Sequence, residues 1–400
     1  MKSGICFVSP HIPPSFGGGG RRIYNIANYL ANQGHKIDII TSTPNNNAIK
    51  NLNINVVSFP PLYSKNYTNK LLTVLIKTIY QPFIITQLFK YISKRRFKII
   101  HIVGSRSGIS FYSVLIAKLK GIKVINGTSG FGNDDPLTIK SMKYGFIRYI
   151  VHFKVPDIIL NNSPLLSETC LKSHISKEKI KMIPNPVYEK KFYPVKLKEK
   201  NNIKRKLNLD QYKTIFLTVS LILPPKNIEE VIDVFEKCYK NDQNSILLII
   251  GKVIEQEKYY YEKLKKIITE KGLNSSVIFY GESDKIPDIM RVSDYFLFTS
   301  KREGMPNVVL EAMSSGLPII IKRIPEVTDI MFEDNNGIVY EVLEEGVNGA
   351  LNLMNNPNLK KTISINARKT AVDKFSYPII INEYLNLYKS LNLSGKGSNR

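Results

Sequence analysis

Short runs of apolar residues, rich in Ile, Val and Phe, alternate along the chain with longer segments in which apolar residues recur every three or four positions. The short runs predict buried strands, and the longer segments predict amphipathic helices. In the first half, strands are expected at Gly4–Ser9, Lys36–Thr41, Ile54–Ser58, Lys98–Val103, Lys123–Asn126 and Asp157–Leu160. A loop is expected at Gly17–Gly20, followed by a helix at Arg22–Gln33 that Gly34 ends. This alternation is typical of a parallel sheet covered by helices.

The alternation restarts after a lysine-rich stretch without apolar periodicity, Tyr188–Asn202, which we expect to be a linker. Beyond it, strands are expected at Thr214–Val219, Ser245–Ile250, Ser276–Tyr280, Tyr295–Thr299 and Pro318–Ile321. Helices are expected at Asn227–Lys240, Glu257–Lys271 and Asn307–Ser315. The pattern therefore predicts an α/β protein of two doubly wound units, a class that binds ligands at the carboxyl ends of its strands.

The charge of the chain is concentrated in its first half. The 400 residues hold 57 Lys and Arg against 33 Asp and Glu, a formal net charge of +24. Residues 1–200 contribute 30 and 8 of these, and residues 201–400 contribute 27 and 25. Codon bias would act evenly along the chain, so we expect the first half to meet an anionic partner.

Composition excludes several classes of protein. With 43% hydrophobic and 22% charged residues the chain is neither disordered nor collagen-like nor a multi-span membrane protein. Three scattered cysteines, Cys6, Cys170 and Cys238, exclude a disulfide framework and fit a reducing compartment. We expect no secretory signal at the N-terminus, and the most apolar stretch, Leu71–Ile92, is interrupted by Lys77, Pro82 and Lys90.

The strongest candidate for chemistry is the segment Ser300–Met313, which follows the predicted strand Tyr295–Thr299. Gly304 frees the loop, Pro306 stands where a helix can begin, and Asn307 can cap that helix, so unpaired backbone N–H groups would face a ligand. A diphosphate suits such a helix N-terminus. Glu303 precedes the helix and Glu311 lies about one turn into it, so the two carboxylates can reach different hydroxyls of one ligand.

This segment resembles the donor-binding signature of family-four glycosyltransferases, which have the GT-B fold. The resemblance extends over nearly the whole chain: Ser9–Thr41, Val155–Pro186, Val277–Glu311 and Phe375–Tyr388 each resemble a family segment. It implies domains at 1–187 and 203–374 facing a cleft, joined by the linker 188–202. It also implies that residues 375–400 form a helix that packs back on the first domain.

The resemblance implies transfer of a sugar from a nucleotide-diphosphate sugar with retention of configuration and without a required metal or other cofactor. Glu303, as the catalytic acid of the family pattern, would contact the donor sugar, and Glu311 the ribose. The remaining implied donor-binding residues are Gly18, Gly19, Lys226, Gly304, Met305, Pro306, Asn307 and Val308.

Two departures from the family pattern weaken the expectation of activity. Of the usual Arg-x4-Lys pair for the diphosphate only Lys226 is present, because Leu221 stands in place of the Arg; Arg21 or Arg22 are candidate substitutes. Ser129 stands where many members have a His that contacts the sugar, and it can hydrogen-bond a sugar hydroxyl but is no base by itself.

Other polar residues of the first half leave alternatives open. Asp134 and Asp135 either position an acceptor hydroxyl or cap a helix that begins at Pro136. His101 either faces the cleft or is a packing histidine, the interpretation we favour. None of the five histidines has the spacing of a metal ligand.

Basic and apolar residues are interleaved in two stretches of the first half, Lys65–Lys98 and Lys140–Lys154. They read either as solvated lysine-rich helix faces or as amphipathic helices for an anionic membrane surface, which is the reading we favour. Nucleic acid is the rival partner for this charge, but no nucleic-acid-binding motif accompanies it.

We therefore expect a cytoplasmic enzyme, peripheral on the inner face of the membrane, that extends a lipid-linked glycan for capsule, O-antigen (lipopolysaccharide) or exopolysaccharide. The alternative is a non-catalytic protein of the same fold that binds glycan or membrane, supported only by Leu221 and Ser129.

Overall fold

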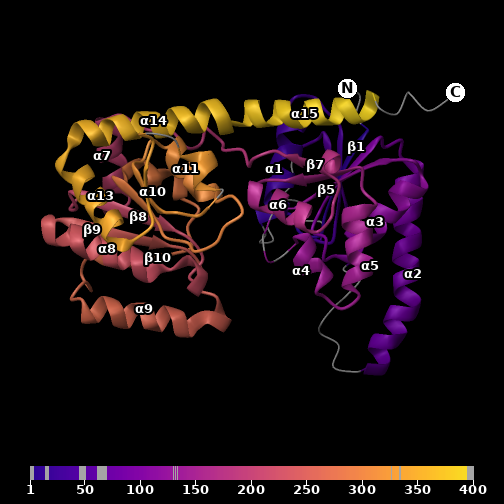
Figure 1. Cartoon of the computed structure of the whole chain (residues 1–400), viewed down its shortest axis with the longest axis horizontal. Helices are drawn as coiled ribbons and strands as arrows, with labels where there is room; N and C mark the ends of the chain where they lie inside the picture. Colours follow the sequence, from indigo (N-terminus) through magenta and orange to yellow (C-terminus); the bar gives the residue numbers. More distant parts are fainter. Residues whose placement is uncertain are drawn as a thin grey trace. The chain divides into compact units, whose positions relative to one another are not determined.

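The computed structural model describes residues 4–13, 18–44, 51–60, 70–128, 130, 132, 134–325, 327–332 and 335–393. They divide into two compact units (Figure 1). The first unit comprises residues 1–185 together with 381–400, and the second comprises residues 186–380. The expected pair of α/β units is confirmed.

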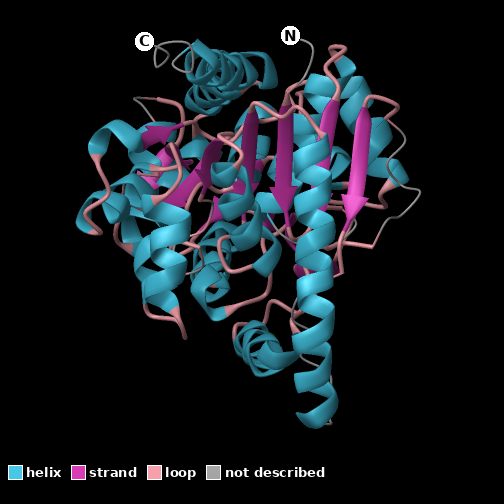
Figure 2. Ribbon diagram, turned by 90° about the vertical axis from the view of Figure 1, so that its right-hand side faces the viewer, coloured by secondary structure: helices cyan, strands magenta, loops and turns pink. Residues whose placement is uncertain are grey.

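The first unit is built on a seven-stranded parallel sheet with strand order β3-β2-β1-β4-β5-β6-β7. Its strands are β1 (Ile5–Ser9), β2 (Ile37–Thr41), β3 (Ile54–Ser58), β4 (Ile99–Val103), β5 (Lys123–Gly127), β6 (Ile158–Asn161) and β7 (Ile180–Met182). Figure 2 shows its strands with their arrowheads pointing the same way and helices on either side. Consecutive strands β1 and β2 pair in register, and β1 also pairs with β4, so the order of the sheet reverses between them. Ligands of such sheets bind at this reversal point.

Helical elements connect the strands of this first sheet. They are α1 (Gly18–Asn32), α2 (Lys70–Lys94), α3 (Gly108–Leu119), α4 (Pro136–Lys140), α5 (Gly145–Tyr149), the π-helical turn η1 (Ile150–Lys154), α6 (Pro164–Lys172) and the 3₁₀ turn η2 (Lys177–Lys179). Apolar residues of β1, β4, α2 and α3 form a buried core that includes Val8, Ile100, Leu88 and Val114. Burial of these side chains fixes the sheet beneath the loops at its carboxyl edge.

The second unit has a six-stranded parallel sheet with order β10-β9-β8-β11-β12-β13. Its strands are β8 (Thr214–Val219), β9 (Ser245–Ile250), β10 (Val277–Gly281), β11 (Tyr295–Phe298), β12 (Ile319–Lys322) and β13 (Ile338–Tyr340). Strand β9 shows why continuous apolar runs become central strands, because alternate side chains enter separate cores. Ile246 and Leu248 pack on one face, and Leu247 and Ile249 pack on the other.

Helices again cover both faces of the second sheet. The helical elements are α7 (Leu197–Lys206), η3 (Pro224–Lys226), α8 (Ile228–Asn241), η4 (Glu255–Glu257), α9 (Lys258–Glu270), α10 (Ile286–Val292), α11 (Asn307–Ser314), α12 (Thr328–Met331), α13 (Leu343–Asn355) and α14 (Pro357–Phe375). The last helix, α15 (Tyr377–Leu393), begins in this unit, and from Ile381 onward its residues belong to the first unit.

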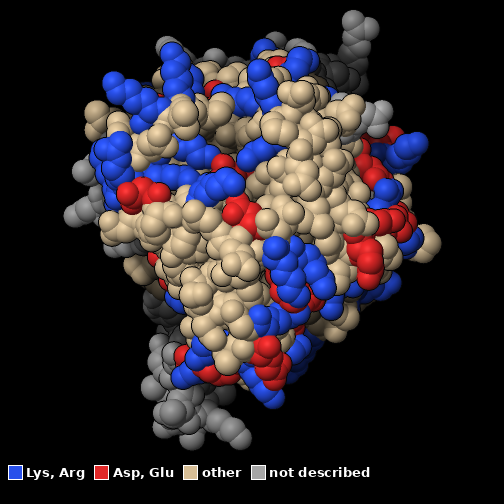
Figure 3. Space-filling view, turned by 90° about the vertical axis from the view of Figure 1, so that its left-hand side faces the viewer, with Lys and Arg blue, Asp and Glu red and all other residues tan. Residues whose placement is uncertain are grey.

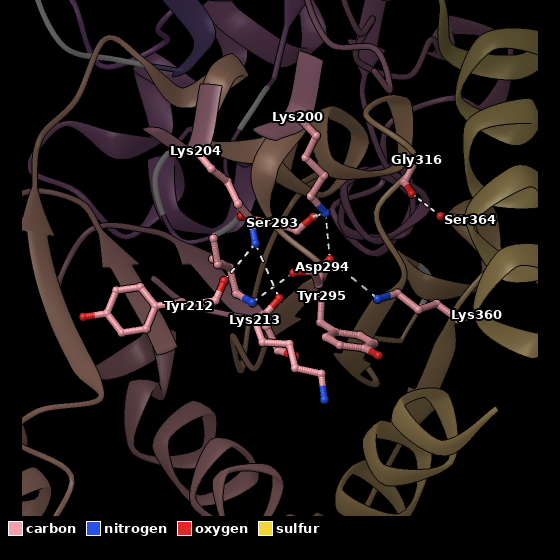
Figure 4. A network of polar contacts seen from close by, with 12 residues as sticks. Lys200, Lys204, Tyr212, Lys213, Ser293, Asp294, Tyr295, Gly316, Lys360 and Ser364 are labelled. Carbon is pink, nitrogen blue, oxygen red and sulfur yellow. Dashed lines mark hydrogen bonds and ion pairs between the residues drawn. The ribbon is translucent and has the colours of Figure 1, made fainter. Parts of the chain in front are cut away.

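The expected linker at 188–202 is wrong in its second half. Residues from Leu197 onward form α7, and Lys200 donates to Asp294 at 2.7 Å, just before β11. Lys360 of α14 approaches the same carboxylate at 3.7 Å, and Figure 4 shows both lysines directed at it. This partly buried cluster ties α7 and α14 to the sheet, so the lysine-rich stretch is part of the second unit and not a free connection.

The glycine run at Gly17–Gly20 is also not the expected loop, because α1 begins at Gly18. A Cβ atom on Gly20 would lie 1.8 Å from the carbonyl oxygen of His11. Glycine is therefore required inside the first turn, where the helix passes close to the chain that leaves β1. Strands β7 and β13 were not expected from the sequence.

Candidate active site

Two loops meet at the carboxyl edge of the second sheet, because β8 and β11 are neighbours there. The backbone N–H of Lys301 donates to the carbonyl of Pro225 at 2.9 Å. The hydroxyl of Thr299 donates to the carbonyls of Lys226 and Asn227 at 3.1 and 2.8 Å. These bonds hold the loop after β8 against the loop after β11 and fix the positions of their charged side chains.

Lys226 and Glu303, one from each loop, form an ion pair with a direct hydrogen bond. Their side chains are 22% and 17% exposed, so water screens the pair only in part. The sequence implied that these residues would hold the diphosphate and the sugar of a donor. The structure brings the two together, and each neutralises the charge of the other.

The helix α11 begins beside this pair. Pro306 occupies the position before the first helical residue, and no side chain caps the helix there, so the expected capping by Asn307 is wrong: Asn307 is the first helical residue. Met305 is buried and anchors the loop below the helix start. In the first turn of α11 the N–H groups of Val309 and Leu310 donate to the carbonyl of Pro306 at 3.1 and 3.4 Å, and the dipole of the helix gives this end a partial positive charge that favours an anion. Glu311 is partly buried in the next turn.

Leu221, which replaces the usual arginine, is 43% exposed in the loop after β8. Arg22 does not take its place, because it is only 5% exposed inside the first unit and donates to Asn185 at 3.2 Å and to the carbonyl of Thr128 at 3.4 Å. Arg21 remains an exposed residue of α1.

The sequence did not predict a second ion pair in this unit, between the end of β12 and the first turn of α8. Lys322, at the end of β12, donates to both carboxylate oxygens of Glu230 at 2.9 and 2.8 Å. Glu230 lies in the first turn of α8 and also accepts from Asn227 at 2.5 Å. Lys322 directly follows a predicted strand, and polar residues in that position lie at the ligand edge of a parallel sheet, so this signal was available.

In the first unit, the predicted donor contacts Gly18 and Gly19 are the first two residues of α1. Their N–H groups belong to the unpaired set at a helix N-terminus, so the revised local structure still suits a phosphate. Contact of these two glycines with a donor stays a prediction.

The predicted acceptor residues Asp134 and Asp135 lie in the loop after β5, and both make hydrogen bonds there. Asp135 caps α4: its carboxylate accepts from the N–H groups of Leu137 and Thr138 at 3.1 and 3.0 Å, and from that of Gly132 at 2.7 Å. Asp134 accepts from the N–H of Gly130 at 2.9 Å. Both carboxylates are buried, which favours the capping alternative over the acceptor alternative for Asp135. Ser129 lies outside the described residues.

His101 is a packing histidine. It is fully buried on β4, its Nδ1 lies 2.9 Å from the hydroxyl of Tyr388 on α15, and its ring packs near Phe7 and Tyr384. Burial, together with the nearby charge of Arg22, lowers the pKa of His101 to about 3. The side chain is therefore neutral at physiological pH.

Two other findings concern metals and membranes. Within the described residues, no group of three or more His, Cys, Asp or Glu side chains is placed to hold a metal ion. Among the helices in the described part of the chain, none is long and apolar enough to cross a membrane.

Both units of the chain match glycosyltransferase family models. Residues 16–191 match the family model described as Glycosyltransferase Family 4, and residues 199–370 match that described as Glycosyl transferases group 1. The crystal structure of Anabaena HepE in complex with UDP superposes with a TM-score of 0.78 at 18% identity, covering 98% of this chain and 100% of that one.

Two curated relatives are similar over most of their length. The UDP-Gal:alpha-D-GlcNAc-diphosphoundecaprenol alpha-1,3-galactosyltransferase of Escherichia coli is 27% identical over 75% of this chain and 77% of its own. The capsular polysaccharide biosynthesis glycosyltransferase CapM of Staphylococcus aureus is 27% identical over 65% of this chain and 69% of its own. Taken with the two α/β units, these matches show that the chain belongs to the family-four glycosyltransferases and has the GT-B fold.

Proposed function

We propose that this glycosyltransferase moves a hexose from a nucleotide-diphosphate sugar to a lipid-linked glycan in the synthesis of a bacterial surface polysaccharide. The observation that carries the donor part is the Lys226–Glu303 pair beside the start of α11. A cation, a helix N-terminus and a carboxylate are the groups that a diphosphate and a sugar hydroxyl need. The lipid-linked acceptor and the pathway are supported by the names of the relatives in Escherichia coli and Staphylococcus aureus.

The proposed mechanism relies on electrostatic stabilisation of the leaving group. As the bond between the anomeric carbon and the diphosphate breaks, negative charge grows on the phosphate oxygen, where the ammonium of Lys226 and the positive end of the α11 dipole stabilise it. The acceptor hydroxyl attacks the same face of the sugar, and its proton passes to the departing diphosphate, so the configuration is retained. Glu303 holds sugar hydroxyls, and Glu311 holds the ribose.

The positive charge that a divalent metal supplies to a diphosphate in other enzymes would come here from Lys226 and the dipole of α11. We therefore expect transfer to continue at an undiminished rate after treatment with EDTA. A loss of activity that Mg²⁺ or Mn²⁺ restores would contradict this part of the proposal.

The deciding experiment is sugar transfer by purified protein with a panel of nucleotide sugars and an undecaprenyl-diphosphate-linked acceptor. We expect one donor to be used, the anomeric proton coupling of the product to show retention, and Glu303→Ala and Glu311→Ala each to lower kcat/KM by at least about a hundredfold. Glu344→Ala, an exposed carboxylate on α13, is the matched control. Unchanged transfer in both site variants would overturn the site, and saturable donor binding without any turnover would instead favour the non-catalytic alternative.

A further inference from the structure

The surface of the first unit between residues 70 and 156 carries no exposed carboxylate among its described side chains. This stretch contains fifteen lysines and arginines but only two acids, Asp134 and Asp135. Both are buried, at 4% and 1% exposed. By contrast, the face in Figure 3, on the side where the helices of the second unit lie in Figure 1, shows Lys and Arg intermixed with Asp and Glu. Three of the fifteen cations in residues 70–156 pair with acids outside this stretch, Lys118 and Lys123 with Asp157 and Arg95 with Asp38, so the excess positive charge lies on the others.

Large apolar side chains are exposed within this same stretch. Residues 136–154, comprising α4, α5 and η1, are called here the docking finger. Tyr144, Phe146, Ile147 and Ile150 in it are 69%, 64%, 54% and 36% exposed. Single exposed apolar residues are ordinary, but four large ones within seven positions are a local concentration of exposed apolar side chains that calls for a partner.

The docking finger is anchored to the first unit by the side chains of its other face. Ile139, Tyr149 and Phe153 are buried in a cluster with residues of β6 and α6. The chain between α4 and α5 turns tightly, since a Cβ atom on Gly145 would lie 2.3 Å from the carbonyl oxygen of Lys140. Because the inner face of the docking finger is already occupied by Ile139, Tyr149 and Phe153, the exposed apolar residues stay in contact with water.

Cations border the exposed apolar residues. Lys140, Lys143, Arg148 and Lys154 lie within the docking finger, and the ammonium of Lys143 is 5.4 Å from the centroid of the Tyr144 ring. Aromatic rings with lysines at their edge are the composition of segments that lie in the interface of a bilayer. A second copy of this chain would bring the same positive charge and be repelled.

We propose that the docking finger inserts its exposed apolar residues into the interface of an anionic bilayer, while its cations contact the lipid headgroups. Helix α3 packs against both η1 and α2; Phe83 and Lys90 of α2 are exposed, and Lys120 of α3 lies over the ring of Phe89 at 4.6 Å. The described helices thus include a surface for lying on a membrane. Residues 65–69 and the side chains of 70–80, which the sequence also singled out, lie outside the described part.

The inserted segment is joined directly to the loop after β5. Asp135 caps the first turn of α4 and also accepts from the N–H of Gly132, so loop and docking finger form one hydrogen-bonded body. A lipid-linked acceptor carries its sugars just above the bilayer surface. This link to the acceptor rests on the proposed function, whereas docking itself does not.

The absence of tryptophan from the chain gives a direct test. Phe146→Trp places a single tryptophan in the docking finger, and Tyr259→Trp places one at a site of equal exposure, 64%, on α9 of the second unit. With phosphatidylglycerol-containing vesicles, we expect the emission of the Phe146→Trp variant to shift to the blue and to be quenched by brominated acyl chains. The Tyr259→Trp variant should show neither effect. Unchanged emission of the Phe146→Trp variant, or equal changes in both variants, would overturn the proposal.

Co-sedimentation of the full chain with the same vesicles tests the two chemical components separately. Phe146→Ser with Ile147→Ser should lower binding at least tenfold, and Lys140→Gln with Lys143→Gln about thirtyfold at low salt. The control is Val342→Ser with Ile365→Ser, residues that are 54% and 55% exposed in the second unit, and it should bind like the parent. Melting temperatures close to that of the parent would show that each variant is folded.

Three outcomes would contradict docking to lipid: equal binding to phosphatidylcholine alone, tighter and equally variant-sensitive binding to duplex DNA, or self-association that the serine variants abolish. Transfer to a water-soluble acceptor separates this proposal from the proposed function. Turnover without vesicle binding would defeat the docking finger alone, and vesicle binding without turnover on any donor would defeat the proposed function alone.

Discussion

At the scale of single residues, Lys226 and Glu303 neutralise each other in one ion pair. If Lys226 holds the diphosphate and Glu303 the sugar, as proposed, a nucleoside diphosphate draws Lys226 away from Glu303 and leaves that carboxylate without its cation, whereas a nucleotide sugar also donates hydroxyl hydrogen bonds to the carboxylate. The pair therefore opposes binding of the product more than binding of the donor.

This opposition can be measured with Glu303→Gln. We expect the variant to bind the nucleoside diphosphate of its donor about fivefold more tightly, the factor that about 1 kcal/mol gives, while transfer falls by at least about a hundredfold. Isothermal titration calorimetry on the parent, the variant and a Glu344→Gln control checks this. Weaker binding of the diphosphate in Glu303→Gln would mean that the pair does not compete with the ligand.

Two buried histidines of the first unit predict sensitivity to acid. Burial is the main cause that lowers the pKa of both His101 and His152 from 6.5 to about 3. Below pH 6.5 the unfolded chain takes up protons that the folded chain does not, so stability falls from that pH down to about pH 3. As the pH falls from 6.5 to 5, each of these histidines should lower the free energy of unfolding by about 2 kcal/mol.

Calorimetric unfolding of His152→Leu checks this expectation, because both ring nitrogens of His152 lack hydrogen-bond partners among the described residues. The variant should lose less stability between pH 6.5 and 5 than the parent does. Equal slopes in the variant and the parent would contradict a neutral, buried His152.

At the scale of elements, Asp135 is the residue on which the loop after β5 and the start of α4 depend. Asp135→Ala removes a helix cap and the acceptor for Gly132, and we expect it to lower the free energy of unfolding by about 1–2 kcal/mol. Asp135→Asn keeps a capping oxygen and should retain most of the stability. Urea denaturation compares the two, and equal losses would show that the charge matters and not the cap.

The long elements of both sheets followed from the sequence because their strands are continuous apolar runs buried on both faces, as in β9. Strand β7 was missed because it is a short edge strand whose residues are partly or fully exposed, so it carries no apolar signature. The start of α1 was misplaced because three glycines disfavour a helix, and the close approach of Gly20 to His11 becomes visible only in three dimensions.

The members of the candidate site could be predicted, but their pairing could not. The loop around Glu303 and the helix after it carry a local pattern of glycine, proline and acid. Lys226 lies 77 positions earlier, and only the adjacency of β8 and β11 brings it to Glu303. The apolar surface of the docking finger was likewise hidden, since Tyr149 and Phe146 look alike in sequence although one is buried and the other exposed.

At the scale of the whole molecule, α15 supplies part of the core of the first unit. Tyr384 and Tyr388 are fully buried there, and Tyr388 lies within hydrogen-bonding distance of His101. Tyr388→Ala should lower the free energy of unfolding of this unit by about 3–5 kcal/mol, whereas Tyr388→Phe should cost about 1 kcal/mol. Calorimetry together with limited proteolysis would locate the loss, and destabilisation confined to the second unit would contradict the assignment.

The position of α15 also has a consequence for how the protein is made. The Nδ1 of His101 can contact the hydroxyl of Tyr388 only after the ribosome has added another 287 residues. At about 5–20 residues per second, that interval lasts from about a quarter of a minute to about a minute. The first unit to leave the ribosome is therefore the last to complete its core, and during this time the nascent chain holds open a surface that chaperones can bind.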